Sequence, residues 1–209
     1  MVDKILRDSS QGTRIIDAGC GTGIVSQRLV AAGHPVYGFD NNPGMLEPAH
    51  ARRESMPAGD RKNWQIETGD VLSFPDSAPR DADTLILNNV LFYVSEPRLV
   101  LDESIRHLRP GAVLIATGPR HRPDPRHIFK CAFDEWQQDG QDMAQLSSAV
   151  EHFMQCTQQL TSGTDEMVTF FEPQDLVSLL QEVGFRDVLE ASGEDYYGEN
   201  FYVAMRLPE

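Results

Sequence analysis

The sequence is poor in cysteine, in long apolar runs and in positive charge. Its three cysteines are an odd number and form no Cys-x-x-Cys motif, which is typical of reduced thiols in a cytosol. No run approaches the roughly 18 apolar residues of a membrane span, and the first residues contain no signal-type apolar core. These absences predict a cytoplasmic protein that does not act on a membrane.

The low number of positively charged residues limits the kinds of molecule that the protein is expected to bind. Against 18 Lys and Arg stand 32 Asp and Glu, which gives a formal net charge of −14. Such a chain repels phosphate backbones and anionic lipids, so nucleic acid is excluded as a general partner and a small-molecule substrate is expected. With 209 residues, the whole chain is predicted to fold as one domain over 1–209.

Closely spaced glycines follow the first apolar segment. An acid ends this segment and glycine then occupies every second position, in the run Asp17-Ala18-Gly19-Cys20-Gly21-Thr22-Gly23. Glycine has no Cβ, so its backbone adopts left-handed angles and lies close to a ligand, while the next helix begins with unpaired N–H groups. The run predicts a cradle for a nucleotide-type cofactor, with Cys20 as a small filler rather than a nucleophile.

The spacing of the glycines separates two kinds of cofactor. The nicotinamide fingerprint Gly-x-Gly-x-x-Gly would need glycine where Ile24 stands, which leaves a dehydrogenase as a weaker alternative. The pattern Asp-x-Gly-x-Gly-x-Gly closely resembles the first motif of class I methyltransferases, which use S-adenosylmethionine. The resemblance extends from Arg14 to Arg206. It implies that the acid and the adjoining backbone hold the amino-acid end of this cofactor.

The same resemblance implies further cofactor-binding residues. Asp40 stands about twenty residues after the loop, where an acid accepts hydrogen bonds from ribose hydroxyls. Met45 falls where apolar side chains pack on the adenine, although burial in the core would explain it equally. Asp70 resembles the acid of the third motif, which contacts the adenine amino group. Asn88 resembles the residue of the fourth motif that faces the sulfonium. The implied set is Asp17, Ala18, Gly19, Cys20, Gly21, Gly23, Asp40, Asn41, Met45, Asp70, Val71 and Asn88.

Strand-like and helical segments alternate along the chain. We expect strands at 14–17, 35–39, 64–67, 84–87, 112–117, 186–190 and 200–206, and helices at 26–32, 45–53, 97–108 and 173–183. Alternation of this kind predicts an α/β fold, a Rossmann-like, doubly wound seven-stranded sheet in an α/β/α sandwich. The resemblance implies that the sheet is mostly parallel with an antiparallel edge strand formed by the last two segments.

A long insertion separates the fifth and sixth predicted strands. Most members of the resembled family cover the cofactor with a helical segment before the first strand, whereas only about a dozen residues precede it here. We expect the insertion at about 121–170 to be a helical lid instead, although extra core or a homodimer face would use the same side chains. Its large apolar residues are Phe129, Phe133, Trp136, Met143, Leu146, Phe153, Met154 and Leu160.

Three residues are candidates for a role in methyl transfer itself. Transfer from a sulfonium mainly requires alignment of donor and acceptor and exclusion of water, and a hydroxyl acceptor gains from a base. Asn88 would face the sulfonium, Tyr93 would shape the methyl channel or pack in the core, and His121 is a candidate base. His127 is a second candidate, and each histidine could equally be a solvated loop residue. The basic run 120–127 lies beyond the carboxyl end of a predicted strand, which predicts an acceptor with a carboxylate or phosphate.

A metal site is not expected. The pairs His127/Cys131 and His152/Cys156 each have the spacing of one helical face, as a zinc site would need. Chance explains two such pairs in a chain with six histidines and three cysteines.

The sequence therefore predicts an S-adenosylmethionine-dependent methyltransferase that acts on oxygen or nitrogen of a small anionic metabolite and forms S-adenosylhomocysteine. One alternative is an enzyme that cyclises or eliminates the aminobutyl chain of the same cofactor. Another is a binding protein that retains the pocket without turnover.

Overall fold

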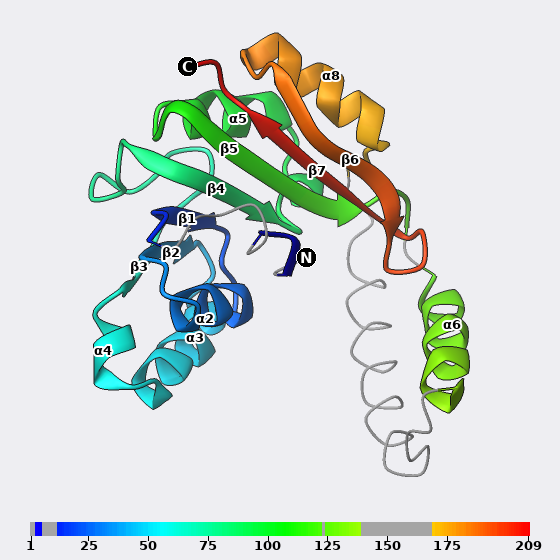
Figure 1. Ribbon diagram of the computed structural model, residues 1–209, viewed down its shortest axis with the longest axis horizontal. Helices are drawn as coiled ribbons and strands as arrows, with labels where there is room; N and C mark the ends of the chain where they lie inside the picture. Colours follow the sequence, from blue (N-terminus) through cyan, green and yellow to red (C-terminus); the bar gives the residue numbers. More distant parts are fainter. Residues whose placement is uncertain (1–2, 6–11, 123, 139–168) are drawn as a thin grey trace.

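The computed structural model describes residues 3–5, 12–122, 124–138 and 169–209, which form a seven-stranded sheet with helices on both faces (Figure 1). The strands are β1 (Ile15–Ala18), β2 (Val36–Asp40), β3 (Trp64–Thr68), β4 (Ala82–Asn88), β5 (Leu108–Pro119), β6 (Asp187–Asp195) and β7 (Asn200–Arg206). The helices are α2 (Ile24–Ala31), α3 (Pro43–Ser55), α4 (Ala58–Arg61), the 3-10 helix η1 (Leu91–Tyr93), α5 (Pro97–Ile105), α6 (Pro125–Gln138) and α8 (Pro173–Val183).

The strand order is β3-β2-β1-β4-β5-β7-β6, and β1 to β5 run parallel. This confirms the predicted fold class. The expected antiparallel edge needs one refinement, because β7 is antiparallel to both β5 and β6 and lies one position in from the edge. The edge strand β6 therefore runs in the same direction as β5, and all strands except β7 end on one side of the sheet.

The helix predicted at 97–108 ends earlier than its sequence suggests. Helix α5 ends at Ile105, and β5 begins at Leu108. The His107 carbonyl accepts the Ala82 N–H at 3.0 Å, and the His107 ring bonds to the Pro79 carbonyl at 2.8 Å. These bonds to the start of β4 replace a further helical turn, so tertiary contacts outweigh local helical propensity here.

Local signals explain why other helices begin and end where they do. Pro43 and Pro173 occupy first-turn positions of α3 and α8, where a missing N–H is not needed. The Asn42 side chain accepts the Gly44 N–H at 2.9 Å and so caps α3. Gly184 ends α8 with a φ of 122°, an angle that a residue with a side chain rarely adopts.

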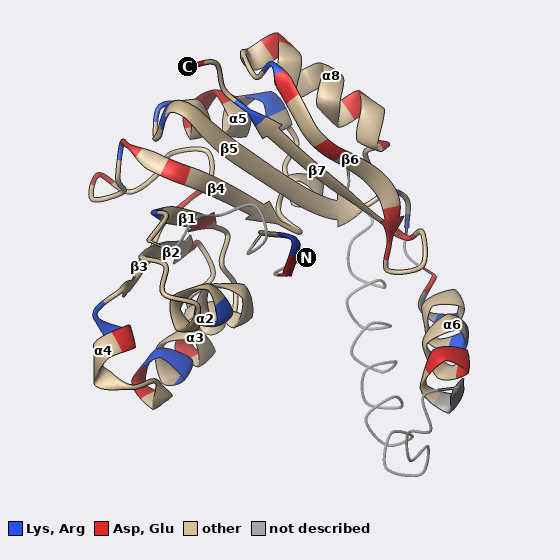
Figure 2. Ribbon diagram, viewed as in Figure 1, with Lys and Arg blue, Asp and Glu red and all other residues tan. Residues whose placement is uncertain are grey.

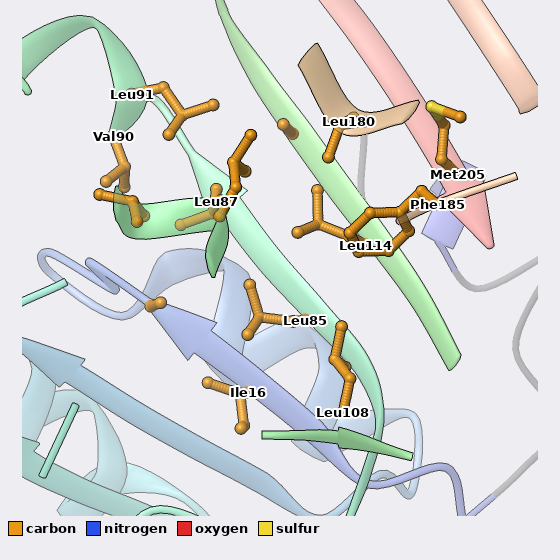
Figure 3. Packing of buried hydrophobic residues seen from close by; sticks show 14 of the residues in the cluster. Ile16, Leu85, Leu87, Val90, Leu91, Leu108, Leu114, Leu180, Phe185 and Met205 are labelled. Atoms are coloured by element: carbon orange, nitrogen blue, oxygen red, sulfur yellow. The ribbon is translucent and has the colours of Figure 1, made fainter. Parts of the chain in front are cut away.

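The sheet separates two apolar clusters, one against each layer of helices. The larger joins strand residues to α5 and α8, and Figure 3 shows Leu114 of β5 close to Leu180 and Phe185. The smaller joins the opposite face to α2 and to Met56, which directly follows α3. Burial on both faces makes the sheet a firm platform for the loops that follow its strands.

Candidate cofactor site

The glycine loop links β1 to α2 and folds back on β2. Its Gly19 and Cys20 N–H groups both donate to the Phe39 carbonyl, at 2.8 and 2.9 Å, and the Gly23 N–H donates to Cys20 at 3.0 Å. All three loop glycines have positive φ, 75° at Gly19, 54° at Gly21 and 75° at Gly23. The backbone thus takes the left-handed angles expected from the glycine spacing.

The three glycines face different surroundings. A Cβ on Gly19 would lie 2.5 Å from the Val90 side chain, and one on Gly23 would lie 2.7 Å from Trp64. A Cβ on Gly21 would meet nothing within 4 Å. Packing therefore requires two of the glycines, and Gly21 alone faces open space where a ligand could lie against the backbone.

Asp40 comes to the same loop from the end of β2. Its carboxylate accepts the Gly21 N–H and the Asn42 N–H, each at 2.9 Å, and the residue is only partly buried. A carboxylate has about four lone-pair positions, so two amide donors leave acceptor capacity for ligand hydroxyls. The structure brings the predicted acid and the predicted glycine into direct contact.

The loop after β3 lies beside this pair. Asp70 accepts the Leu72 N–H at 2.8 Å and an Asn41 side-chain N–H at 3.5 Å, so Asn41 joins the β2 and β3 loops. Met45 is 41% exposed and Leu72 is 46% exposed. Met45 does not pack in the core, and both apolar side chains are available to an aromatic ligand ring. Val71 packs partly against the larger apolar cluster, so its backbone is the part available to a ligand.

The β4 loop closes the site beyond the glycines. Asn88 pairs with Thr117 across β4 and β5, and the Thr117 hydroxyl donates to its side-chain oxygen at 2.7 Å. Ala18 is fully buried and can offer only backbone to a ligand. Tyr93 is 54% exposed with its ring 3.9 Å from that of Phe92, so it is not the core residue that one alternative expected.

Below the loop lies a buried polar pair that sequence reasoning did not find. The Ser26 hydroxyl, on α2, donates to Asp17 at 2.5 Å, and both residues are almost completely buried. Burial raises the pKa of Asp17 to about 6, the Ser26 hydroxyl opposes this rise, and the charge of Asp40 adds to it. Burial, with Asp17 and Asp40 nearby, also raises the pKa of the Cys20 thiol, so Cys20 stays protonated and poorly nucleophilic.

His121 stands just past the carboxyl end of β5, next to an acid that the sequence did not single out. Its Nδ1 lies 3.5 Å from the buried Glu199 carboxylate, which also accepts the Asp124 N–H at 3.0 Å. Glu199 is remote in sequence and arrives only because Asn200 of β7 pairs with Pro119 of β5. No local pattern could have found this contact.

The basic run 120–127 is less open to ligands than its sequence suggests, because Arg120 is bound internally. Its guanidinium donates to Glu172 at 2.6 and 3.0 Å, and to the carbonyls of Gly193 and Gly198 at 3.1 and 3.2 Å. Figure 2 shows that positively and negatively charged residues lie close together along α6. Arg120 therefore ties the start of the insertion to α8 and to the β6–β7 hairpin.

We expect Arg120→Ala to lower stability rather than to change the affinity for substrate. Loss of four hydrogen bonds, two of which are partly buried, should cost about 2 kcal/mol and lower Tm by roughly 4–8 °C. Thermal unfolding followed by circular dichroism measures this, with the exposed Arg186→Ala as control. An unchanged Tm together with a raised KM would show instead that Arg120 contacts the acceptor.

In the described part of the chain, the histidine and cysteine pairs do not form a metal site. His127 and Cys131 lie 3.9 Å apart on α6, and His152 and Cys156 fall outside the described residues. Within the described ranges, no group of three or more side chains that could bind a metal is present. A separate search of the same residues for a helix of sufficient length and hydropathy to span a membrane finds none. Of the predicted lid side chains, those at 143, 146, 153, 154 and 160 also fall outside these ranges.

Comparison with known proteins agrees with this geometry. The model of a family described as "Methyltransferase domain" matches residues 9–184. The chain belongs to the class I S-adenosylmethionine-dependent methyltransferases. S-adenosylmethionine is the cofactor of this family, and the open face of Gly21, the Asp40 carboxylate and the exposed Met45 and Leu72 fit an adenosine-bearing ligand.

Individual relatives are more distant. A trans-aconitate 2-methyltransferase of Azoarcus sp. is 31% identical over 115 residues, which is 54% of this chain and 42% of that protein. The chain spans less than half the length of the first curated relatives it matches. Many solved structures share the fold, and two of them are examples. One is a Synechocystis magnesium protoporphyrin IX methyltransferase (17% identity, TM-score 0.66, 99% of this chain and 80% of that one). The other is the [4+2]-cyclase SpnF (15% identity, TM-score 0.67, 99% and 79%).

Proposed function

We propose that this chain transfers a methyl group from S-adenosylmethionine to oxygen or nitrogen of a small anionic metabolite. The observation that carries the proposal is the contact between Asp40 and the Gly21 backbone, beside the only loop glycine with open space in front of it. This pairs an acceptor for ribose hydroxyls with bare backbone. Among the relatives are trans-aconitate and ubiquinone-biosynthesis methyltransferases, which supports a small-molecule acceptor.

In this proposal, the residues around the site bind and orient the cofactor. Asp40 accepts ribose hydroxyls, Asp70 and the Val71 backbone bind the adenine edge, and Met45 packs on the ring. Asn88 is held by Thr117 with its side-chain oxygen already used, so its amide N–H groups remain for a ligand. When bound, the cofactor supplies a methyl group on a positively charged sulfur, which needs alignment more than acid–base chemistry.

Catalysis of transfer to a hydroxyl is assigned to His121. The Arg122 carbonyl, 3.2 Å from Nδ1, and the Glu199 carboxylate, 3.5 Å from it, orient the ring, while Nε2 takes the hydroxyl proton. Tyr93, exposed on η1, lines the acceptor side. Within the basic run, we assign recognition of an acceptor carboxylate or phosphate to the exposed Arg122 and Arg126.

The insertion at about 121–170 is proposed as the cover of the site. Its described ends are attached next to the strand ends that form the site. At the entry, the Asp124 N–H donates to Glu199. At the exit, the Thr169 N–H donates to the Phe92 carbonyl at 3.1 Å, next to Tyr93 on η1. Both attachments support a role for the insertion in excluding water from methyl transfer.

Incubation with methyl-labelled S-adenosylmethionine and fractionated cell extract tests this function. We expect S-adenosylhomocysteine to accumulate only when a fraction contains the acceptor, and mass spectrometry to find the label on a small anionic product. Methylthioadenosine released without any acceptor would show attack within the aminobutyl chain instead. Cofactor binding without product in every fraction would identify a binding protein.

Once the acceptor is known, His121→Ala should lower kcat about a hundredfold or more and leave the Kd of S-adenosylmethionine unchanged. The exposed His50→Ala on α3 is the matched control. An unchanged kcat would mean that His121 is not the base, as for an amine acceptor that attacks unprotonated.

A further inference from the structure

The floor of the glycine loop contains a carboxylate with very little access to water. Asp17 is 1% exposed and Ser26, on the first turn of α2, is 0% exposed. The Ser26 hydroxyl donates to Asp17 Oδ2 at 2.5 Å, and both its hydroxyl and its backbone N–H lower the pKa of this carboxyl. Ser26 is therefore the residue through which the protein stabilises a charge on Asp17.

Among the described residues, the neighbours of Asp17 add no positive charge. The ionisable groups that face it are the Asp40 carboxylate, from β2, and the Cys20 thiol, from the loop. In the described part of the chain, Asp17 forms no ion pair with lysine or arginine. A buried carboxylate without a cationic partner is costly, so a cation bound nearby would stabilise it.

The cofactor and its product differ in their positive charge. Both compounds carry an α-ammonium group, but S-adenosylmethionine also carries a sulfonium cation, where S-adenosylhomocysteine has a neutral sulfur. An ionised Asp17 beneath the loop therefore attracts the methyl donor more strongly than the product. A protonated Asp17 does not distinguish them by charge.

We propose that Ser26 is a positioning residue of the cofactor site, which keeps Asp17 ionised at neutral pH so that the loop binds the cationic donor in preference to the neutral product. The inference concerns cofactor binding and holds whichever acceptor is methylated. It assigns a role to a residue that need not touch the cofactor itself.

The pKa of about 6 for Asp17 sets the direction of the effect. As the pH falls from about 7.5 to about 5, Asp17 takes up a proton, and the affinity for S-adenosylmethionine should fall roughly fivefold to tenfold. The affinity for S-adenosylhomocysteine should change less. At about pH 6, binding of the methyl donor should release a fraction of a proton, because the cation favours the ionised acid.

Isothermal titration calorimetry of the full chain with each compound tests the proposal over this pH range. In Ser26→Ala, the loss of the hydroxyl should raise the midpoint of the pH dependence by about one pH unit, since the neutral acid is then favoured. In Asp17→Asn, the pH dependence should disappear. Ser104→Ala removes an equally buried serine on α5, whose hydroxyl bonds to Val100, and should behave as wild type.

Two results would overturn the proposal. One is a Ser26→Ala variant whose affinity falls by the same factor at every pH, which would show a merely structural role. The other is an Asp17→Asn variant that keeps the wild-type pH dependence. If Ser26→Ala does not fold, proton release on binding of S-adenosylmethionine to wild type is measured instead, near pH 6 in two buffers of different ionisation enthalpy. Absence of proton release refutes the inference. Failure of S-adenosylmethionine to bind wild type at any pH would instead refute the cofactor assignment, and this inference with it.

Discussion

Asp40→Ala is expected to weaken S-adenosylmethionine binding by about a hundredfold or more while the chain stays folded. The carboxylate lies partly exposed between the Gly21 and Asn42 N–H groups and can still accept ligand hydroxyls. Hydrogen bonds to a charged group contribute about 1.5–3 kcal/mol each, so the loss of two accounts for the expected factor. Calorimetry at neutral pH measures the change in Kd, and circular dichroism verifies the fold.

Two variants serve as references for this measurement. Asp187→Ala removes an exposed acid at the start of β6, at the opposite end of the strands, and should bind the cofactor as wild type does. Asp40→Asn keeps hydrogen-bonding atoms but loses the charge, so its affinity for the cofactor should lie between those of Asp40→Ala and Asp187→Ala. A change of less than about threefold in Asp40→Ala would contradict the assignment of Asp40 to the ribose.

Alanine substitution at Gly23 should lower stability more than substitution at Gly21, whereas substitution at Gly21 should lower the affinity for the cofactor more. At Gly23, the added Cβ meets the fully buried Trp64 ring at 2.7 Å and the backbone has a φ of 75°. Overpacking and left-handed strain together should cost about 3 kcal/mol or more and lower Tm by roughly 10 °C. At Gly21, the strain alone should cost about 1–2 kcal/mol, because the Cβ enters open space.

Binding reverses this order. The Cβ in Gly21→Ala would occupy the space proposed for the cofactor, so this variant should lose most of its affinity for S-adenosylmethionine. Thermal unfolding with and without the cofactor separates the two effects, since a bound ligand raises Tm. Equal losses of Tm in the two variants, or full stabilisation of Gly21→Ala by the cofactor, would contradict the different roles of these glycines.

Much of the fold could be predicted because its signals are local. Alternating apolar segments and glycine or proline at segment ends indicate the elements, and helix 173–183 and strand 200–206 have the predicted bounds. The position of β7 between β5 and β6 is not visible in the sequence, since strand order depends on contacts between remote segments. The same reason explains the early end of α5, because the hydrogen bonds of His107 to Pro79 and Ala82 prevent a further helical turn.

The site shows the same division. Chain spacing alone indicates Asp17, the glycines and Asp40, because an apolar strand that ends in an acid and runs into alternating glycines is typical of a cofactor loop. Spacing does not indicate Ser26 and Glu199, since each matters through a side chain that it meets only after folding. The basic run predicts a ligand site, but its Arg120 binds Glu172 and two carbonyls of the β6–β7 hairpin instead.

By itself, the sequence determined that this chain forms a mostly parallel α/β sheet with a glycine cradle after its first strand, because backbone angles and hydrophobic periodicity are properties of short segments. The tertiary structure alone decided that Gly21 faces open space while Gly19 and Gly23 face Val90 and Trp64. It also decided that Asp17 is buried beneath the loop with Ser26 as its donor. Burial and electrostatic environment arise from the packing of distant segments, which spacing along the chain does not encode.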